Sequence, residues 1–166
     1  MDPQQLLTHV IRPVLQHLDL RSEAAEILLL GTVAHESKCG EYLHQVGGPA
    51  LGIYQIEPVT HFDVWENYLR YKSGLMLKIQ DMVPVAQRRR TPGGWVSGSD
   101  AMLITDLAYA TAIARVIYLR APMKLPEADD LHGLAAYWKK YYNTPLGKGT
   151  VEKWLSDYAK YVVGDK

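Results

Sequence analysis

Hydrophobic residues recur at intervals of three and four along most of the chain, which is the spacing of a helix with one buried face. Residues 3 to 18 show this pattern, and Pro3 after Asp2 is typical of a helix start. Alternation of apolar and polar positions, which would indicate a strand, never runs convincingly beyond about five residues. The pattern therefore predicts a mainly α protein.

Residues 23 to 37 are predicted to form a central, surrounded helix, because 27 to 34 are apolar on almost every face. Ser22 is placed to cap it, and Glu23 and Glu26 suit its first turn. Further helices are expected over 58–69, 75–82, 100–120, 131–142 and 151–162. Residues 84 to 99, PVAQRRRTPGGWVSGS, read as a long connection of the kind that is usually functional or mobile.

The length of 166 residues favours one domain, residues 1–166, with its own core. Eighteen basic and eighteen acidic residues give zero formal charge, so no overall field would draw the protein to nucleic acid or to an anionic membrane. The longest apolar run is far shorter than the ~20 residues that span a bilayer, and we expect no transmembrane segment. The N-terminus does not resemble a signal peptide, which predicts synthesis in the cytoplasm.

Cys39 is the only cysteine, which excludes an intrachain disulfide and a thiolate zinc cage. His35-Glu36 resembles the start of the zinc-protease signature His-Glu-x-x-His, but Cys39 stands where the second histidine belongs. Cys39 as a nucleophile, with His35 or His44 as its base, has no third partner to support it. We expect no metal and no cofactor. The run 88–90 of three arginines could contact phosphate or acidic parts of a cell wall, although such runs are more often solvated surface.

Glu36 lies at the C-terminal end of the apolar helix. Desolvation and the negative end of the helix dipole both disfavour a charged carboxylate there, so its pKa should rise. A carboxylic acid that keeps its proton near neutral pH can protonate a leaving oxygen, as in glycosidic cleavage. The alternative is that Glu36 simply faces water where the helix emerges.

Three ordered blocks resemble the lytic transglycosylase and goose-type lysozyme superfamily. The blocks are Glu36-Ser37, then GPALGIYQI at 48–56 with Pro58 and Thr60, and then AAY at 135–137 with YNTPLG at 142–147, followed by Val151 and Trp154. The third block is stretched, because five residues separate its two candidate tyrosines. The resemblance covers roughly residues 25–70 and 130–156. The local sequences His-Glu-Ser and Gln-x-Glu-Pro-x-Thr-His look like bacteriophage or prophage proteins.

The resemblance implies a lysozyme-like single domain of about six to eight helices with a cleft and little or no β-structure. It implies cleavage of the bond between N-acetylmuramic acid and N-acetylglucosamine in peptidoglycan by a monomer, with Glu36 as general acid and base. Ser37 would position the glutamate or the substrate, and either Tyr137 or Tyr142 would steady Glu36. Asn143 is another candidate substrate contact. Because it directly follows Tyr142, it favours Tyr142 over Tyr137 as the tyrosine that steadies Glu36.

Other substrate contacts are suggested by the residue types. Gln55 has an amide that can bind a sugar acetamide or tie down its own loop. Tyr54 and Trp95 could stack on sugar faces, whereas core packing is the expected role of Trp65, Trp138 and Trp154.

A second carboxylate would decide the type of product. If one activates water, the enzyme is a hydrolase; if none does, the 6-hydroxyl of muramic acid attacks and an anhydro sugar results. Inverting hydrolysis requires the two carboxylates roughly 6.5 to 9.5 Å apart. Glu57 and Asp63 are the candidates, and the alternative for Glu57 is a charge at a helix N-terminus.

The phage resemblance leaves two roles open. An endolysin would reach the cell wall after release through a separate membrane-pore protein, a holin, whereas a virion component would be packaged. A phage virion or tail-associated protein could also keep the fold for structure or glycan binding, with little or no catalysis. The retained Glu36 favours the enzyme.

Overall fold

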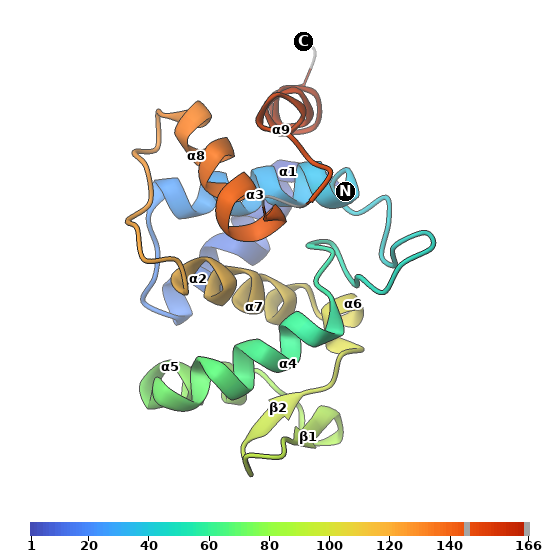
Figure 1. Ribbon diagram of the computed structural model, residues 1–166, viewed down its shortest axis with the longest axis vertical. Helices are drawn as coiled ribbons and strands as arrows, with labels where there is room; N and C mark the ends of the chain where they lie inside the picture. Colours follow the sequence, from blue (N-terminus) through green and yellow to red (C-terminus); the bar gives the residue numbers. More distant parts are fainter. Residues whose placement is uncertain (145–146, 165–166) are drawn as a thin grey trace.

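The computed structural model describes residues 1–144 and 147–164, and it confirms that the protein is mainly helical (Figure 1). The first half contains α1 (Pro3–Leu6), the π-helical turn η1 (Leu7–Ile11), α2 (Arg12–His17), α3 (Glu23–Ser37), α4 (Pro58–Asn67), the 3-10 turn η2 (Leu69–Tyr71) and α5 (Ser73–Asp81). The second half contains the 3-10 turn η3 (Val85–Gln87), strands β1 (Arg88–Arg90) and β2 (Val96–Gly98), α6 (Met102–Thr105), α7 (Leu107–Leu119), α8 (Leu131–Trp138) with η4 (Lys139–Asn143), and α9 (Val151–Tyr158) with η5 (Ala159–Val163). In the described part of the chain, no helix combines the length and apolar character needed to cross a membrane.

Helix α3 is the central helix that the sequence predicts, with the same bounds. The Ser22 hydroxyl accepts a hydrogen bond from the backbone N–H of Ala25 (3.1 Å), so the expected cap is confirmed. The helix contacts α7, α8 and α9. Gly31 makes the contact with α9 possible, because a Cβ at this position would lie 1.9 Å from the ring of Trp154. Helix α3 also contacts η1 near the N-terminus and η5 after α9, so its apolar faces are covered by helical segments from both ends of the chain and from its middle.

The single helix predicted over 100–120 is wrong, because the chain breaks at Asp106. Asp106 is extended (φ −130°, ψ 101°), and its carboxylate accepts a hydrogen bond from the N–H of Tyr109 (2.9 Å). An N-capping aspartate ends α6 and starts α7. Helix α7 then crosses the middle of the molecule, where it contacts α3 on one side and α4 on the other (Figure 1).

Residues 84 to 99, predicted as a long connection, contain regular secondary structure. They form η3 and the antiparallel pair β1 and β2, in which Arg89 lies opposite Ser97. The hairpin is held to α5 by the Gln80 amide, which donates to the Val96 carbonyl (2.7 Å). It packs on α7 through Gly98, where a Cβ would lie 2.6 Å from the ring of Tyr109. The sequence does not predict these strands, because each has only three residues, too few to show an alternating pattern.

Candidate active site

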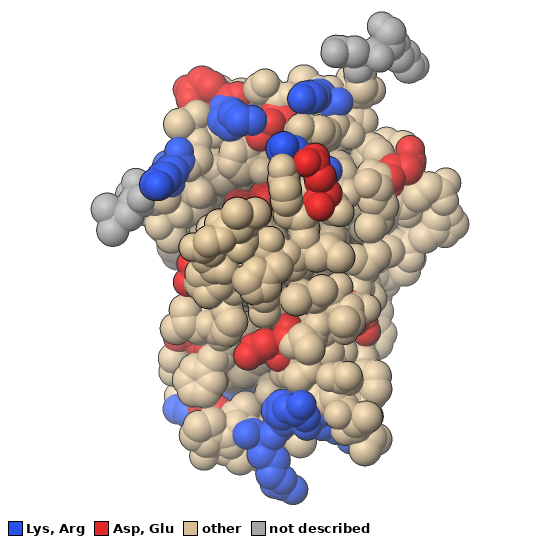
Figure 2. All heavy atoms as spheres, turned by 90° about the vertical axis from the view of Figure 1, so that its right-hand side faces the viewer, with Lys and Arg blue, Asp and Glu red and all other residues tan. Residues whose placement is uncertain are grey.

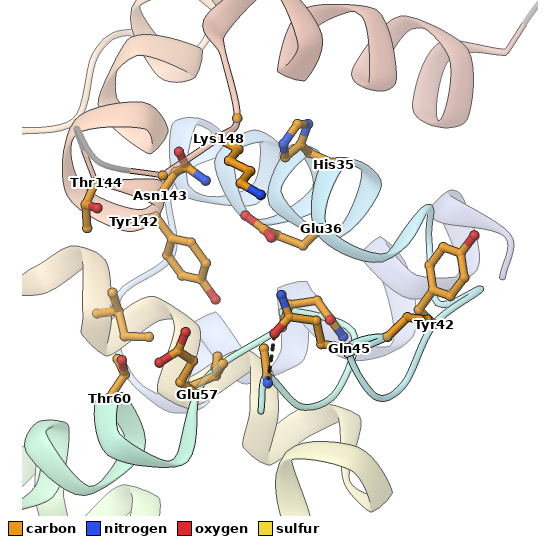
Figure 3. Close-up of a pocket in the computed structure, with 17 residues that line it drawn as sticks. His35, Glu36, Tyr42, Gln45, Glu57, Thr60, Tyr142, Asn143, Thr144 and Lys148 are labelled. Atoms are coloured by element: carbon orange, nitrogen blue, oxygen red, sulfur yellow. Dashed lines mark hydrogen bonds between the residues drawn. The ribbon is translucent and has the colours of Figure 1, made fainter. Parts of the chain in front are cut away.

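A cleft of about 880 Å³ opens between the C-terminal end of α3 and the start of α4 (Figure 3). The described residues that build it come from the end of α3, the loop from 42 to 57, the first turn of α4, Ile117 of α7, and residues 142–144 and 147–149 after α8. The titratable and polar side chains on its walls are His35, Glu36, Tyr42, Gln45, Gln55, Glu57, Thr60, Tyr142, Asn143, Thr144 and Lys148. Its size is in the range of small-ligand sites.

Glu36 projects into this cleft from the last turn of α3. Its Oε1 accepts a hydrogen bond from the indole Nε1 of Trp138 (3.1 Å). Burial raises the pKa of Glu36 from 4.5 to about 7, and the Trp138 bond opposes this only in part. Lys148 points toward Glu36 in Figure 3, but no ion pair to Glu36 forms among the described residues. Glu36 therefore carries its proton for much of the time at neutral pH.

Of the two candidate tyrosines, Tyr142 lines the cleft together with Glu36. Its hydroxyl donates to the backbone carbonyl of Tyr54 (2.7 Å), and its ring stacks on that of Tyr118 (5.1 Å between centroids). Burial raises the pKa of Tyr142 well above its ordinary value, and the negative charge of Glu36 adds to this shift. Tyr137 instead donates to the Met123 carbonyl (2.8 Å) and does not line the cleft.

Gln55 lines the cleft from a strained position in the loop before α4. Its backbone is left-handed (φ 48°), and its Nε2 donates to the Gly52 carbonyl (2.8 Å). Gly52 is also left-handed (φ 72°), and a Cβ there would lie 1.8 Å from the Leu103 carbonyl oxygen. Only glycine fits at such a contact. Gln55 thus ties down its own loop and still borders the cleft.

The two candidate second carboxylates lie in different places. Glu57 is exposed at the N-cap position of α4 and points into the cleft from the side opposite Glu36 (Figure 3). Asp63 lies further along α4, outside the cleft, where its carboxylate pairs with Arg120 and accepts from the Asn67 amide (2.5 Å). Of the two, only Glu57 shares the cleft with Glu36.

Three predicted contacts do not line the cleft. The ring of Tyr54 is fully buried, and its hydroxyl bonds with Thr111 (3.1 Å), so it offers no face to a sugar. Trp95 is half-buried in the hairpin. Ser37 is buried, donates to the Val33 carbonyl (3.1 Å) and accepts from the Gly40 N–H (3.0 Å). Ser37 thus stabilises the turn that follows Glu36 and does not face the cleft.

Two neighbours of Glu36 were not predicted. Trp138, assigned to the core, is fully buried and yet its indole N–H reaches Glu36. His35 lines the cleft, its ring meets the Trp138 ring edge-on (4.5 Å between centroids), and its Nδ1 pairs with Asp157 (2.8 Å). Burial lowers the pKa of His35 although Asp157 opposes this shift. These contacts join residues more than 100 positions apart, and no local pattern indicates them.

Within the described residues, no three His, Cys, Asp or Glu side chains come together as metal ligands would. Cys39 is buried beside the end of α3, and burial raises the pKa of its thiol. Comparisons of this chain with protein families, with curated proteins and with solved structures gave no match.

Proposed function

We propose that this protein cleaves the β-1,4 bond between N-acetylmuramic acid and N-acetylglucosamine in bacterial peptidoglycan, with Glu36 as the general acid and then the base. The observation that carries the proposal is a carboxyl group with a pKa of about 7 on the wall of a cleft of about 880 Å³. A general acid works best when its pKa lies near the working pH. The choice of peptidoglycan as the substrate rests on the resemblance of the motifs around Glu36 to those of lytic transglycosylases and goose-type lysozymes.

In the proposed reaction, Glu36 gives its proton to the glycosidic oxygen. The bond from C1 to that oxygen breaks, and its electron pair stays with the leaving sugar. An attacking hydroxyl oxygen then bonds to C1 and loses its proton to a carboxylate. Tyr142 anchors the wall beside Glu36 through its bond to the Tyr54 carbonyl, and Gln55 and Asn143 border the space that the sugars would fill.

The attacking hydroxyl sets the product. If water attacks, Glu57, which borders the same cleft, would take the place of Glu36 as the base, and the hydrolase would release reducing ends. If the 6-hydroxyl of muramic acid attacks instead, the products carry anhydro ends and Glu57 is not needed. Mass spectrometry of the released sugars separates the two reactions.

The test uses purified peptidoglycan and the variants Glu36→Gln, Glu57→Gln and Asp63→Asn. We expect Glu36→Gln to lose cleavage by at least about a thousandfold, as expected when the acid and base are both removed. Asp63→Asn is the matched control outside the cleft and should retain activity. Loss in Glu57→Gln together with reducing ends would assign water activation to Glu57. Release of no muropeptides by the wild type, or equal cleavage by Glu36→Gln, would refute the proposal.

A further inference from the structure

A second cavity, of about 270 Å³, lies on the other side of the first turn of α4, between this helix and the β1–β2 hairpin. We call it the hairpin groove. Its walls are Pro58, His61, Phe62 and Trp65 from α4, residues 89–92 and 97–99 from the hairpin, and Asp100. None of these residues lines the cleft of Glu36, although Glu57 and Thr60 of the same helix turn do.

The floor of the hairpin groove is held by a chain of hydrogen bonds. His61 is buried, its Nδ1 contacts Asp100 (2.7 Å), and its Nε2 contacts the Tyr109 hydroxyl (2.6 Å). The indole N–H of Trp65 donates to the same hydroxyl (3.1 Å). His61 can donate from Nδ1 to Asp100 and accept at Nε2 from Tyr109, whose hydroxyl in turn accepts from Trp65. Hydrogen bonds within the protein thus hold the floor residues in place.

The hairpin side of the groove carries positive charge. Arg89 and Arg90 line it, both are exposed, and neither forms an ion pair with a carboxylate in the described part of the chain. Arg89 lies opposite Ser97, which also lines the groove, and Arg90 ends β1 next to Thr91 and Pro92, which line the groove as well. Figure 2 shows basic side chains gathered at the lower end of the face drawn, the end at which Figure 1 places the hairpin.

Negative charge and apolar surface complete the groove. Asp100 uses one carboxylate oxygen for His61, and its side chain is 52% exposed, so the carboxylate can also meet a cation. Phe62 is an exposed aromatic side chain on the α4 wall. Guanidinium groups bind carboxylates well, and a nearby carboxylate suits an ammonium group. The chemistry fits a short peptide that carries both carboxylates and an amine.

We propose that the hairpin groove binds the stem peptide of peptidoglycan, held through its carboxylates by Arg89 and Arg90. This inference rests on the proposed function, because it is the glycan in the cleft that brings the peptide to α4. The two sites share the first turn of α4, where Thr60 lines the cleft and Pro58 and His61 line the groove, and a helix with its side chains is about 10 to 12 Å across. Three or four extended residues span roughly 10 to 14 Å, so a stem attached to a muramic acid in the cleft can reach the groove.

The test is a nuclear magnetic resonance titration of the whole protein with the free tetrapeptide L-Ala-γ-D-Glu-meso-diaminopimelyl-D-Ala. We expect amide shifts at His61, Ser97 and residues 89–91, and weaker binding in higher salt. The double variant Arg89→Gln/Arg90→Gln should bind roughly tenfold more weakly, because it loses two charge-assisted contacts at an exposed site. The control is Arg88→Gln, which removes the same charge from the same strand but outside the groove.

Equal binding by the double variant and the wild type would overturn the inference, as would shifts confined to the cleft. Binding of a glycerol phosphate oligomer without binding of the peptide would also overturn it and would assign the arginines to phosphate. Cleavage of peptidoglycan is measured separately. Cleavage without peptide binding refutes the groove alone, whereas peptide binding without cleavage refutes the proposed catalysis and leaves the groove as a wall-binding site.

Discussion

Glu36 in the cleft and His61 in the hairpin groove are both titratable side chains that are withdrawn from bulk water, but their partners differ. His61 has a partner for each ring nitrogen, Asp100 and Tyr109. Among the described residues, Glu36 has one donor, Trp138, for a carboxyl group that can accept several hydrogen bonds. A buried group with all its bonds made supports the fold, whereas one with few partners costs stability and remains available for chemistry. The comparison predicts opposite effects of substitution at the two places.

The largest expected effect on stability is at Glu36. Between pH 4.5 and 7 the unfolded chain loses this proton while the folded protein keeps it, so the wild type loses stability as the pH rises through this window. Above pH 7 the loss amounts to about 3 kcal/mol. Glu36→Gln should therefore be more stable than the wild type by about this amount at pH 8 and by little at pH 4. Urea unfolding at both pH values measures it, and an equal difference at both would contradict the assignment.

The opposite effect is expected in the hairpin groove. Tyr109→Phe removes the hydroxyl that the Trp65 indole N–H and the Nε2 of His61 share. These two nitrogens keep only their contact with each other (3.3 Å), so the change should destabilise the protein by about 1 to 2 kcal/mol. The exposed Tyr71 provides the control, since Tyr71→Phe should change stability by less than about 0.5 kcal/mol. Thermal unfolding compares the two variants. If Tyr109→Phe were as stable as the wild type, the hydrogen bonds around His61 would not support the fold, and the contrast drawn with Glu36 would be wrong.

The two candidate tyrosines test which contacts support Glu36. Tyr142→Phe loses the bond to the Tyr54 carbonyl, which ties η4 to the loop that carries Gln55, and cleavage should fall roughly tenfold. Tyr137→Phe loses a similar bond, to Met123, outside the cleft and should cleave like the wild type. The rate of peptidoglycan solubilisation separates them. Equal losses in the two variants would mean that Tyr142 acts only through stability.

The smallest effect concerns the hydrogen bond from Trp138 to Glu36. Because the Trp138 N–H stabilises the ionised carboxylate, Trp138→Phe should raise the pKa of Glu36 further, by less than about one unit. The alkaline limb of the pH–activity profile would move upward. Trp154→Phe is the matched control, because the Trp154 indole N–H is buried and has no partner among the described residues. An unmoved limb in Trp138→Phe would show that the bond does not tune the acid.

The sequence predicts the features that depend on a single segment of the chain. The cap by Ser22 and the apolar run of α3 set that helix and place Glu36 at its end, as predicted. The split at Asp106 was missed, although an aspartate three residues before Tyr109 is a capping signal, because the alanine-rich sequence on both sides favours one helix. The hairpin was missed because three arginines in a row give no strand pattern.

The sequence by itself determined a mainly α chain, the central helix and the carboxyl group at its end, because propensity, capping and hydrophobic spacing act over a few residues. Only the tertiary structure decided what surrounds that carboxyl group. It brought Trp138 to Glu36 and Tyr142 to the neighbouring wall, and it turned Tyr54 and Ser37 inward. It also placed Glu57 in the cleft and Asp63 outside it. Contacts between distant segments depend on how helices pack, and the raised pKa of Glu36 follows from that packing.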